Sequence, residues 1–118
     1  MAQSSAFRER FVIPWVTENA SADLKVNQGV FTDSVGGIDL TLPLQSQVGD
    51  VIAVLDLDGG FTILQNANQQ ITTTGAETTL GVLGELKATA AGNAVLLVCV
   101  EANTTWAVES MNGELELL

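Results

Sequence analysis

The chain has 118 residues, enough for one domain with a core that needs neither a metal nor a disulfide. Its 14 acidic residues outnumber 4 basic ones, giving a net charge of −10, and beyond residue 25 the only base is Lys87. A protein this acidic repels the phosphates of nucleic acids and of anionic membranes. We therefore expect neither a nucleic acid nor a membrane as a partner.

The N-terminal residues show no regular pattern. Residues 1–10 begin with small polar side chains and have no periodicity long enough for a stable helix, which predicts an extended arm. Residues 11–16 are apolar, β-branched and aromatic, but Pro14 lacks a backbone N–H, so this strand should lie at a sheet edge or end there. Residues 19–23 are typical of a loop. We therefore divide the chain into 1–23, the arm with a first edge strand, and 24–118, a β domain.

From residue 24 onward the apolar residues recur with the period of β-strands. Ile38, Leu40 and Leu42 alternate with polar residues, which indicates a strand with one buried face and one solvent-exposed face. Residues 51–55 and 94–100 are apolar at every position, so both faces of these strands should be covered, by a second sheet or by a neighbouring subunit.

Turn residues separate these segments. Asp58-Gly59, between two apolar strands, predicts a hairpin with a tight turn, because both central residues of that turn need a positive φ. Residues 82–88 are compatible with a strand or a short helical turn, and their β-rich surroundings favour a strand. Further turns are predicted at 35–37, 66–68, 74–76 and 91–93.

The C-terminal part continues the alternating pattern. Residues 106–110 predict a strand, and residues 114–118 alternate again and end in an apolar terminus that should dock on the rest of the protein. About ten strands at this spacing predict an all-β fold. We expect an antiparallel β-sandwich, jelly-roll-like or barrel domain with an extended N-terminal arm.

The residues needed for common catalytic and metal sites are missing. The chain has no His and no Tyr, which removes the commonest general base and transition-metal ligand, so we expect no enzyme, no cofactor and no zinc. The single cysteine, Cys99, lies in an apolar strand and should be core, as should Trp106. The carboxylates that alternate with apolar residues should lie on solvated faces, and they are Asp39, Asp56, Glu114 and Glu116. Paired carboxylates or a carbohydrate-binding domain remain the alternatives.

Residues 7–11 are the candidate binding segment. Two of the four bases lie there beside two phenylalanines, and Arg with aromatic residues is the combination enriched at interface hot spots. The alternative is a frayed terminus with incidental charges. No apolar run reaches the about 18 residues of a membrane span and the N-terminus lacks a secretory signal pattern. The candidate partner-binding residues are Phe7, Arg8, Arg10, Phe11 and Trp15.

A frame of short motifs resembles a module of tailed-bacteriophage virion proteins that recurs in trimeric fibres, spikes and head-surface proteins. It spans roughly residues 24–110 and comprises 38–43 (Ile-Asp-Leu-Thr-Leu-Pro), 48–54 (Val-Gly-Asp-Val-Ile-Ala-Val), 61–63 (Phe-Thr-Ile), 69–71 (Gln-Gln-Ile), 94–98 (Ala-Val-Leu-Leu-Val) and 105–108 (Thr-Trp-Ala-Val). The resemblance implies a homotrimeric, β-rich structural protein and carries over no catalytic residue.

The small size and single module favour one member of that class, a decoration (cement) protein on the outer capsid surface. Its partners would be the major capsid protein of the same virion and two further copies of the chain, and it would be made in the host cytoplasm. The alternative is a component of a tail or head fibre or spike, also a trimer. Either way the resemblance predicts a protein that works through its surfaces.

Overall fold

A computed structural model describes residues 13–118, which form twelve strands and no helix. The strands are β1 (Trp15–Glu18), β2 (Ala22–Asp23), β3 (Gln28–Asp33), β4 (Ile38–Thr41), β5 (Val51–Asp58), β6 (Phe61–Leu64), β7 (Gln70–Thr73), β8 (Ala76–Glu77), β9 (Glu85–Ala88), β10 (Ala94–Glu101), β11 (Thr105–Asn112) and β12 (Leu115–Leu117). The predicted all-β character is confirmed. The four further turns that the sequence predicted are also present.

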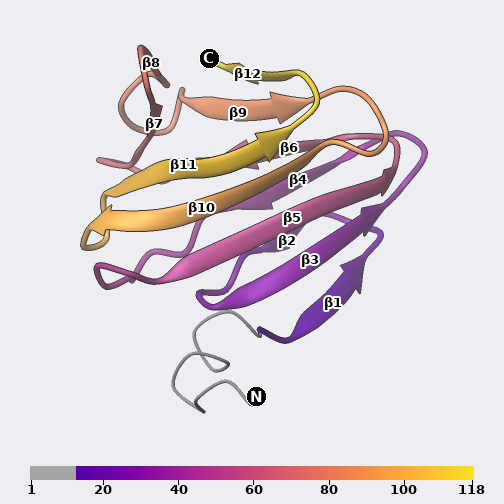
Figure 1. The fold of residues 1–118 in the computed structure, drawn as a ribbon, viewed down its shortest axis with the longest axis horizontal. Coiled ribbons are helices and arrows are strands. Elements are labelled where there is room, and N and C mark those ends of the chain that lie inside the picture. The colour runs from indigo at the N-terminus through magenta and orange to yellow at the C-terminus, as the bar shows by residue number, and fades with distance from the viewer. Residues whose placement is uncertain (1–12) are drawn as a thin grey trace, which may run out of the picture.

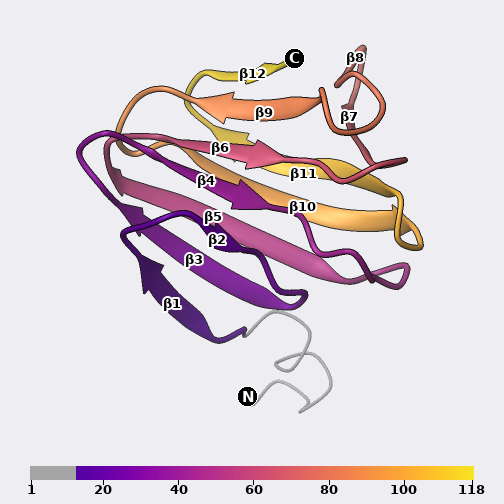
Figure 2. The same ribbon diagram turned by 180° about the vertical axis from the view of Figure 1, so that it is seen from behind.

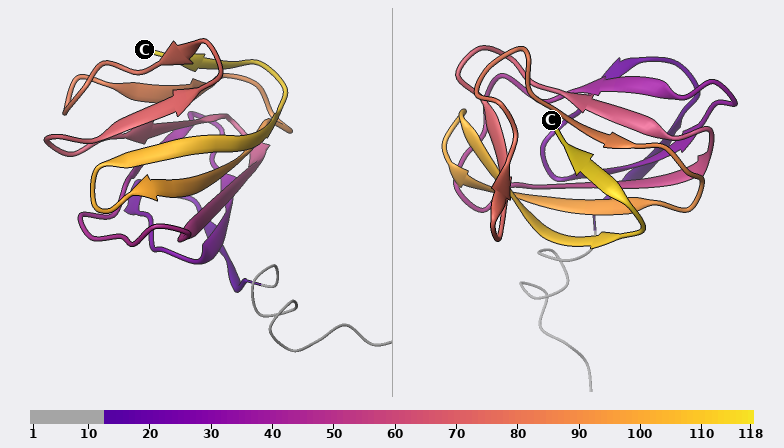
Figure 3. Two further views of the ribbon diagram at one scale, coloured as in Figure 1. Left: turned by 60° about the vertical axis from the view of Figure 1, so that its left-hand side comes forward. Right: turned by 90° about the horizontal axis from the view of Figure 1, so that it is seen from above.

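The strands make two sheets that lie face to face. The seven-stranded sheet has the order β1-β3-β5-β10-β11-β7-β8, and the five-stranded sheet has the order β12-β9-β6-β4-β2. Figure 1 shows the larger sheet in front and Figure 2 shows the smaller one in front. Seen from the side and from above, the described residues form two layers (Figure 3), which gives a sandwich-like arrangement.

The predicted antiparallel arrangement is wrong, because both sheets are mixed. β1, β3 and β5 run parallel in one sheet, and β2, β4 and β6 run parallel in the other. The reason is that each of the first six strands is followed by a strand of the opposite sheet, so the chain goes out in one layer and returns in the other. Neighbours within a sheet therefore point the same way, with a strand as the crossover in place of a helix.

The predicted hairpin at Asp58-Gly59 is also wrong. β5 pairs with β3 and β10, whereas β6 pairs with β4 and β9 in the other sheet. Gly59 and Gly60 have φ angles of 89° and 83°, so the chain does turn with positive φ at this point. A side chain at Gly59 would collide with the carbonyl oxygen of Ser34 in the neighbouring loop. The glycines therefore let the chain cross between sheets where the backbone of another loop lies close.

The core lies between the two sheets and follows the alternation of the sequence. In β5 and β10 every second side chain is fully buried, as Ile52, Val54, Val95 and Leu97 show. Burying such side chains contributes about 1.5–3 kcal/mol each. The whole buried apolar cluster consists of Leu24, Val30, Ile38, Leu40, Leu42, Ile52, Val54, Phe61, Ile63, Ile71, Leu86, Ala88, Val95, Leu97, Cys99 and Trp106. The prediction that Cys99 and Trp106 belong to the core is confirmed.

The two ends of the described chain close the sandwich. The strand predicted over residues 11–16 is shifted, since β1 covers 15–18 and begins directly after Pro14, and residues 11–12 lie outside the described residues. Within residues 13–118 β1 lies at the edge of its sheet, as predicted. The C-terminal strand β12 pairs with β9, and Leu115 and Leu117 pack against the core. The predicted docking of the apolar terminus is thus confirmed. Two segments differ from expectation, since residues 22–23 form the short strand β2 and the strand within 82–88 begins only at Glu85.

Candidate interaction surface

Of the five predicted binding residues the structure describes one. Phe7, Arg8, Arg10 and Phe11 lie outside the described residues, so the structure does not place them. Trp15 opens β1 and is 43% exposed, on the side of the seven-stranded sheet that faces away from the core. The predicted anchor residue therefore stands on an open surface.

Trp15 is held in place by two residues of β3. Its ring stacks on Phe31, with 4.6 Å between the ring centroids and 25° between the planes. Trp15 also pairs with Gly29 in the strand register, and a Cβ at Gly29 would collide with the indole. Sequence reasoning missed this contact, although a glycine within a strand often marks a place where another group approaches the backbone closely.

The rest of this surface is apolar. Because β5 and β10 alternate, the side chains between their buried residues point away from the core, and pairing places these outward residues side by side. We call this surface the outer apolar face. It consists of Trp15, Phe31, Val51, Ala53, Leu55, Ala94, Leu96, Val98 and Ala107.

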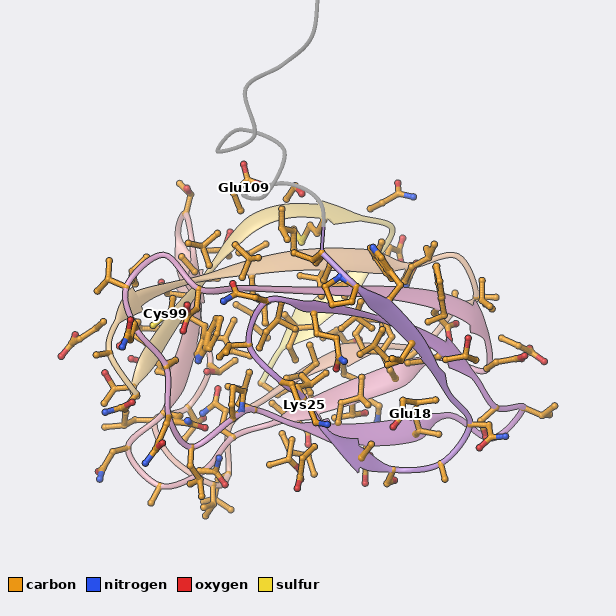
Figure 4. All side chains as sticks on the ribbon, turned by 90° about the horizontal axis from the view of Figure 1, so that it is seen from below. Glu18, Lys25, Cys99 and Glu109 are labelled. Carbon is orange, nitrogen blue, oxygen red and sulfur yellow. The ribbon has the colours of Figure 1, made fainter. Side chains whose placement is uncertain are left out.

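The outer apolar face contains a shallow hollow of about 550 Å³ between Trp15 on one side and Met111 on the other, with Leu55 and Leu96 among its lining. The nearest acid along β11 is Glu109, which sits at the bulge where pairing with β10 shifts register. Figure 4 shows Glu109 outside the sandwich, while Cys99 lies between the layers. The seven-stranded sheet thus presents an apolar centre with a charge at its border.

The acidic residues do not gather into a chemical site. Asp39, Glu114 and Glu116 are exposed, as predicted. Asp56 departs from the prediction, since it is 1% exposed. Its carboxylate accepts hydrogen bonds from the Thr32 hydroxyl at 2.6 Å and from the backbone N–H of Gly60 at 2.9 Å. Because a buried carboxylate needs such donors, the role of Asp56 is to hold the turn after β5.

The remaining chemical candidates are enclosed. Within residues 13–118 no group of three or more His, Cys, Asp or Glu side chains is placed to hold a metal ion. Cys99 is buried, with its sulfur 3.2 Å from the hydroxyl of Ser46. Trp106 is fully buried as well, so its indole is not available to stack on a sugar.

A second group of exposed apolar side chains lies on loops and was not predicted. Leu44 and Val48 belong to the loop before β5, while Leu80, Val82 and Leu83 belong to the loop before β9, with exposures from 62% to 81%. Hydrogen bonds of Gln69 reach both loops, through the carbonyl of Pro43 and the N–H of Gly81. These loops therefore occupy the same end of the sandwich.

No helix in the part of the chain that the structure describes has the length and apolar character to cross a membrane. No family model matches the chain, and no curated protein is similar to it in sequence.

Proposed function

We propose that the protein is a bacteriophage virion structural protein, a capsid decoration (cement) protein that trimerises on the outer head surface and stabilises the capsid by bridging neighbouring capsomers. The observation that carries the proposal is the outer apolar face, which lies over the central strands of the larger sheet; within residues 13–118 no strand packs on it, and its Trp15 is 43% exposed. Large exposed apolar patches are typical of protein-protein contacts.

The motif resemblance supports the virion assignment, and the charge supports the outer location. A body with a net charge of −10 repels polyanions, including nucleic acid packaged inside a head, and does not adhere to anionic host surfaces. The basic residues Arg8 and Arg10 precede β1, so a segment of opposite charge adjoins the apolar surface in the sequence. In this proposal residues 7–11 contact the capsid.

The test uses expanded heads that lack the protein and the purified full chain. We expect the full chain to run as a trimer in light scattering and to cover the heads, visible by cryo-microscopy at many regularly spaced positions. A variant lacking residues 1–11 should remain a trimer and should no longer bind heads. Full decoration by the truncated variant would show that the N-terminal segment is not the anchor.

The same images separate the decoration protein from a fibre component. Density spread over the whole head surface supports the proposal. Density confined to one vertex, the tail or a few projecting fibres contradicts it and favours a fibre or spike. Absence from the particle contradicts both.

A further inference from the structure

We infer that the outer apolar face is the contact between copies of this chain, with Trp15 as its anchor. The inference takes the trimeric state from the proposed function. It goes beyond that function by naming the surface and the residues through which neighbouring copies meet. The charge, the area and the shape of the outer apolar face support it.

The charge of the face favours a second copy over a partner of opposite charge. In the central rows of the cross-strand register the outward side chains are uncharged from β1 to β11, and the acids lie at the strand ends and at the bulge of β11, namely Asp33, Asp58, Glu101 and Glu109. One central row runs through Trp15, Gly29, Ala53, Leu96 and Ser110. Each copy carries a charge of −10, so two copies repel each other least where the uncharged centres of their outer apolar faces meet. A basic partner would meet acids only at the border of this face and none at its centre.

The area of the face suits a subunit contact. β5 and β10 have eight residues each. At about 3.3 Å per residue and about 4.8 Å between strands, the five strands from β1 to β11 cover roughly 500–600 Å². Stable protein interfaces bury about 800 Å² on each partner, so a copy that shares this face between two neighbours must add the rim of the face to each contact.

The shape of the face favours a ring over a two-fold dimer. Large aromatic side chains, Trp15 and Phe31, stand on the β1-β3 side, and smaller aliphatic ones, Leu96 and Ala107, stand on the β10-β11 side, with the hollow between them. In a closed three-fold ring each contact joins two different parts of the surface. The aromatic side of one copy then meets the aliphatic side of the next, and Trp15 is covered.

The experiment compares two matched substitutions on opposite sheets. Leu96→Lys places a charge in the centre of the outer apolar face. Leu64→Lys places the same charge on the outward side of β6 in the other sheet, where its strand partner is Glu85. Both leucines are half-buried and lie within strands. Lysine lowers the net negative charge, so a loss of assembly cannot come from added repulsion between acidic bodies.

Both variants carry Trp106→Phe, which leaves Trp15 as the only tryptophan of the chain. Trp106 Nε1 has no hydrogen-bond partner among the described residues, so the exchange removes no such bond. Light scattering gives the mass, and acrylamide quenching of fluorescence reports the exposure of Trp15. The parent for this comparison carries Trp106→Phe alone. We expect this parent and the Leu64→Lys variant to be trimers in which Trp15 is protected from the quencher. Leu96→Lys should have the mass of one chain, 12.4 kDa, and freely quenched Trp15.

Circular dichroism verifies that each variant keeps its strands. If Leu96→Lys does not fold, Trp15→Lys takes its place, because Trp15 lies on an edge strand outside the core. This variant retains Trp106, and its mass in light scattering is the only readout. A folded variant of either kind that remains a trimer overturns the inference.

The outcomes separate this inference from the proposed function. A Leu96→Lys trimer that binds heads overturns the contact surface and leaves the decoration proposal standing. A monomeric Leu96→Lys variant, beside a parent trimer that does not bind heads, supports the contact surface and overturns the decoration proposal. A parent protein that is monomeric at all concentrations overturns both.

Discussion

At the scale of single residues, Gly29 decides where Trp15 lies. Glycine usually weakens a strand, because it has no side chain to pack and loses more backbone freedom on folding. Here the missing Cβ leaves the space that the indole fills, and Phe31 two residues further on provides the stacking partner. The edge strand β1 is thereby joined to the sheet by an aromatic contact in addition to its ladder.

Replacing this glycine should displace the indole. We expect Gly29→Ala to lower the free energy of unfolding by about 1–2 kcal/mol, because the added methyl group overpacks the contact with Trp15. Chemical denaturation measures the loss, and in the Trp106→Phe background the emission of Trp15 should move to longer wavelength. Gly36→Ala is the matched control, since a Cβ there meets nothing within 4 Å. Equal effects at both positions would contradict the prediction.

At the scale of elements, buried glutamines hold the loops that connect the two sheets. The amide nitrogen of Gln65 donates to the carbonyls of Gln69, Thr79 and Gly81 at 2.7–2.9 Å, and its oxygen accepts from the Thr78 hydroxyl. Gln65 is 4% exposed, so these groups have little access to water. The amide group of Gln65 thus makes several of the hydrogen bonds that hold the segment before β9, with its exposed leucines.

Removing that side chain's polar end should release the loop. We expect Gln65→Leu to destabilise the protein by about 2–4 kcal/mol, because several carbonyls lose their donor and one hydroxyl loses its acceptor. Hydrogen exchange should become faster at the N–H of Gly81, which bonds to the carbonyl of Gln69. The control is Gln47→Leu, an exposed glutamine in the loop before β5. If the two variants unfold at the same denaturant concentration, the network does not hold the loop.

The strands themselves were largely predictable, and their partners were not. Alternation identified β4, and the fully apolar runs identified β5 and β10, because these patterns depend only on the direction of successive side chains. The crossing after β5 was misjudged, since Asp58-Gly59 is as compatible with a turn between sheets as with a hairpin. Whether the chain returns to the same sheet depends on long-range packing, which no local motif encodes.

At the scale of the whole molecule, the excess of acids sets how assembly responds to salt. Copies that each carry −10 repel one another over distances of about 10 Å at 0.1 M salt, and this repulsion weakens as salt rises. Apolar contacts are not weakened by added salt. Association through the outer apolar face should therefore become stronger with ionic strength, unlike association through ion pairs.

Sedimentation equilibrium across a sodium chloride series measures this dependence. We expect the fraction of trimer to grow from low salt to moderate salt. The change should be largest where the screening length falls below the distance between the carboxylates of neighbouring copies. Leu96→Lys, measured at the same salt concentrations, should remain monomeric, which separates specific association from salting out. Dissociation of the parent protein on adding salt would show that charged groups, and not the apolar face, join the subunits.

The candidate surface was visible in the sequence only in part. Residues 51–55 and 94–100 predict strands with two apolar faces, and Trp15 was among the predicted binding residues. Of the neighbours that complete the surface, Gly29 marks a close approach without saying which group approaches, and Phe31 carries no signal of its own. They join it because parallel pairing of β1, β3 and β5 places residues far apart in the sequence in one row.

What the amino-acid sequence determined by itself is the class of element, since side-chain alternation and turn residues act over a few positions. The tertiary structure alone decided that the first six strands alternate between layers, that the sheets are mixed, and that one side of the two apolar strands is left open. These features follow from how the sheets pack against each other, and packing joins segments whose spacing along the chain carries no information about their contact.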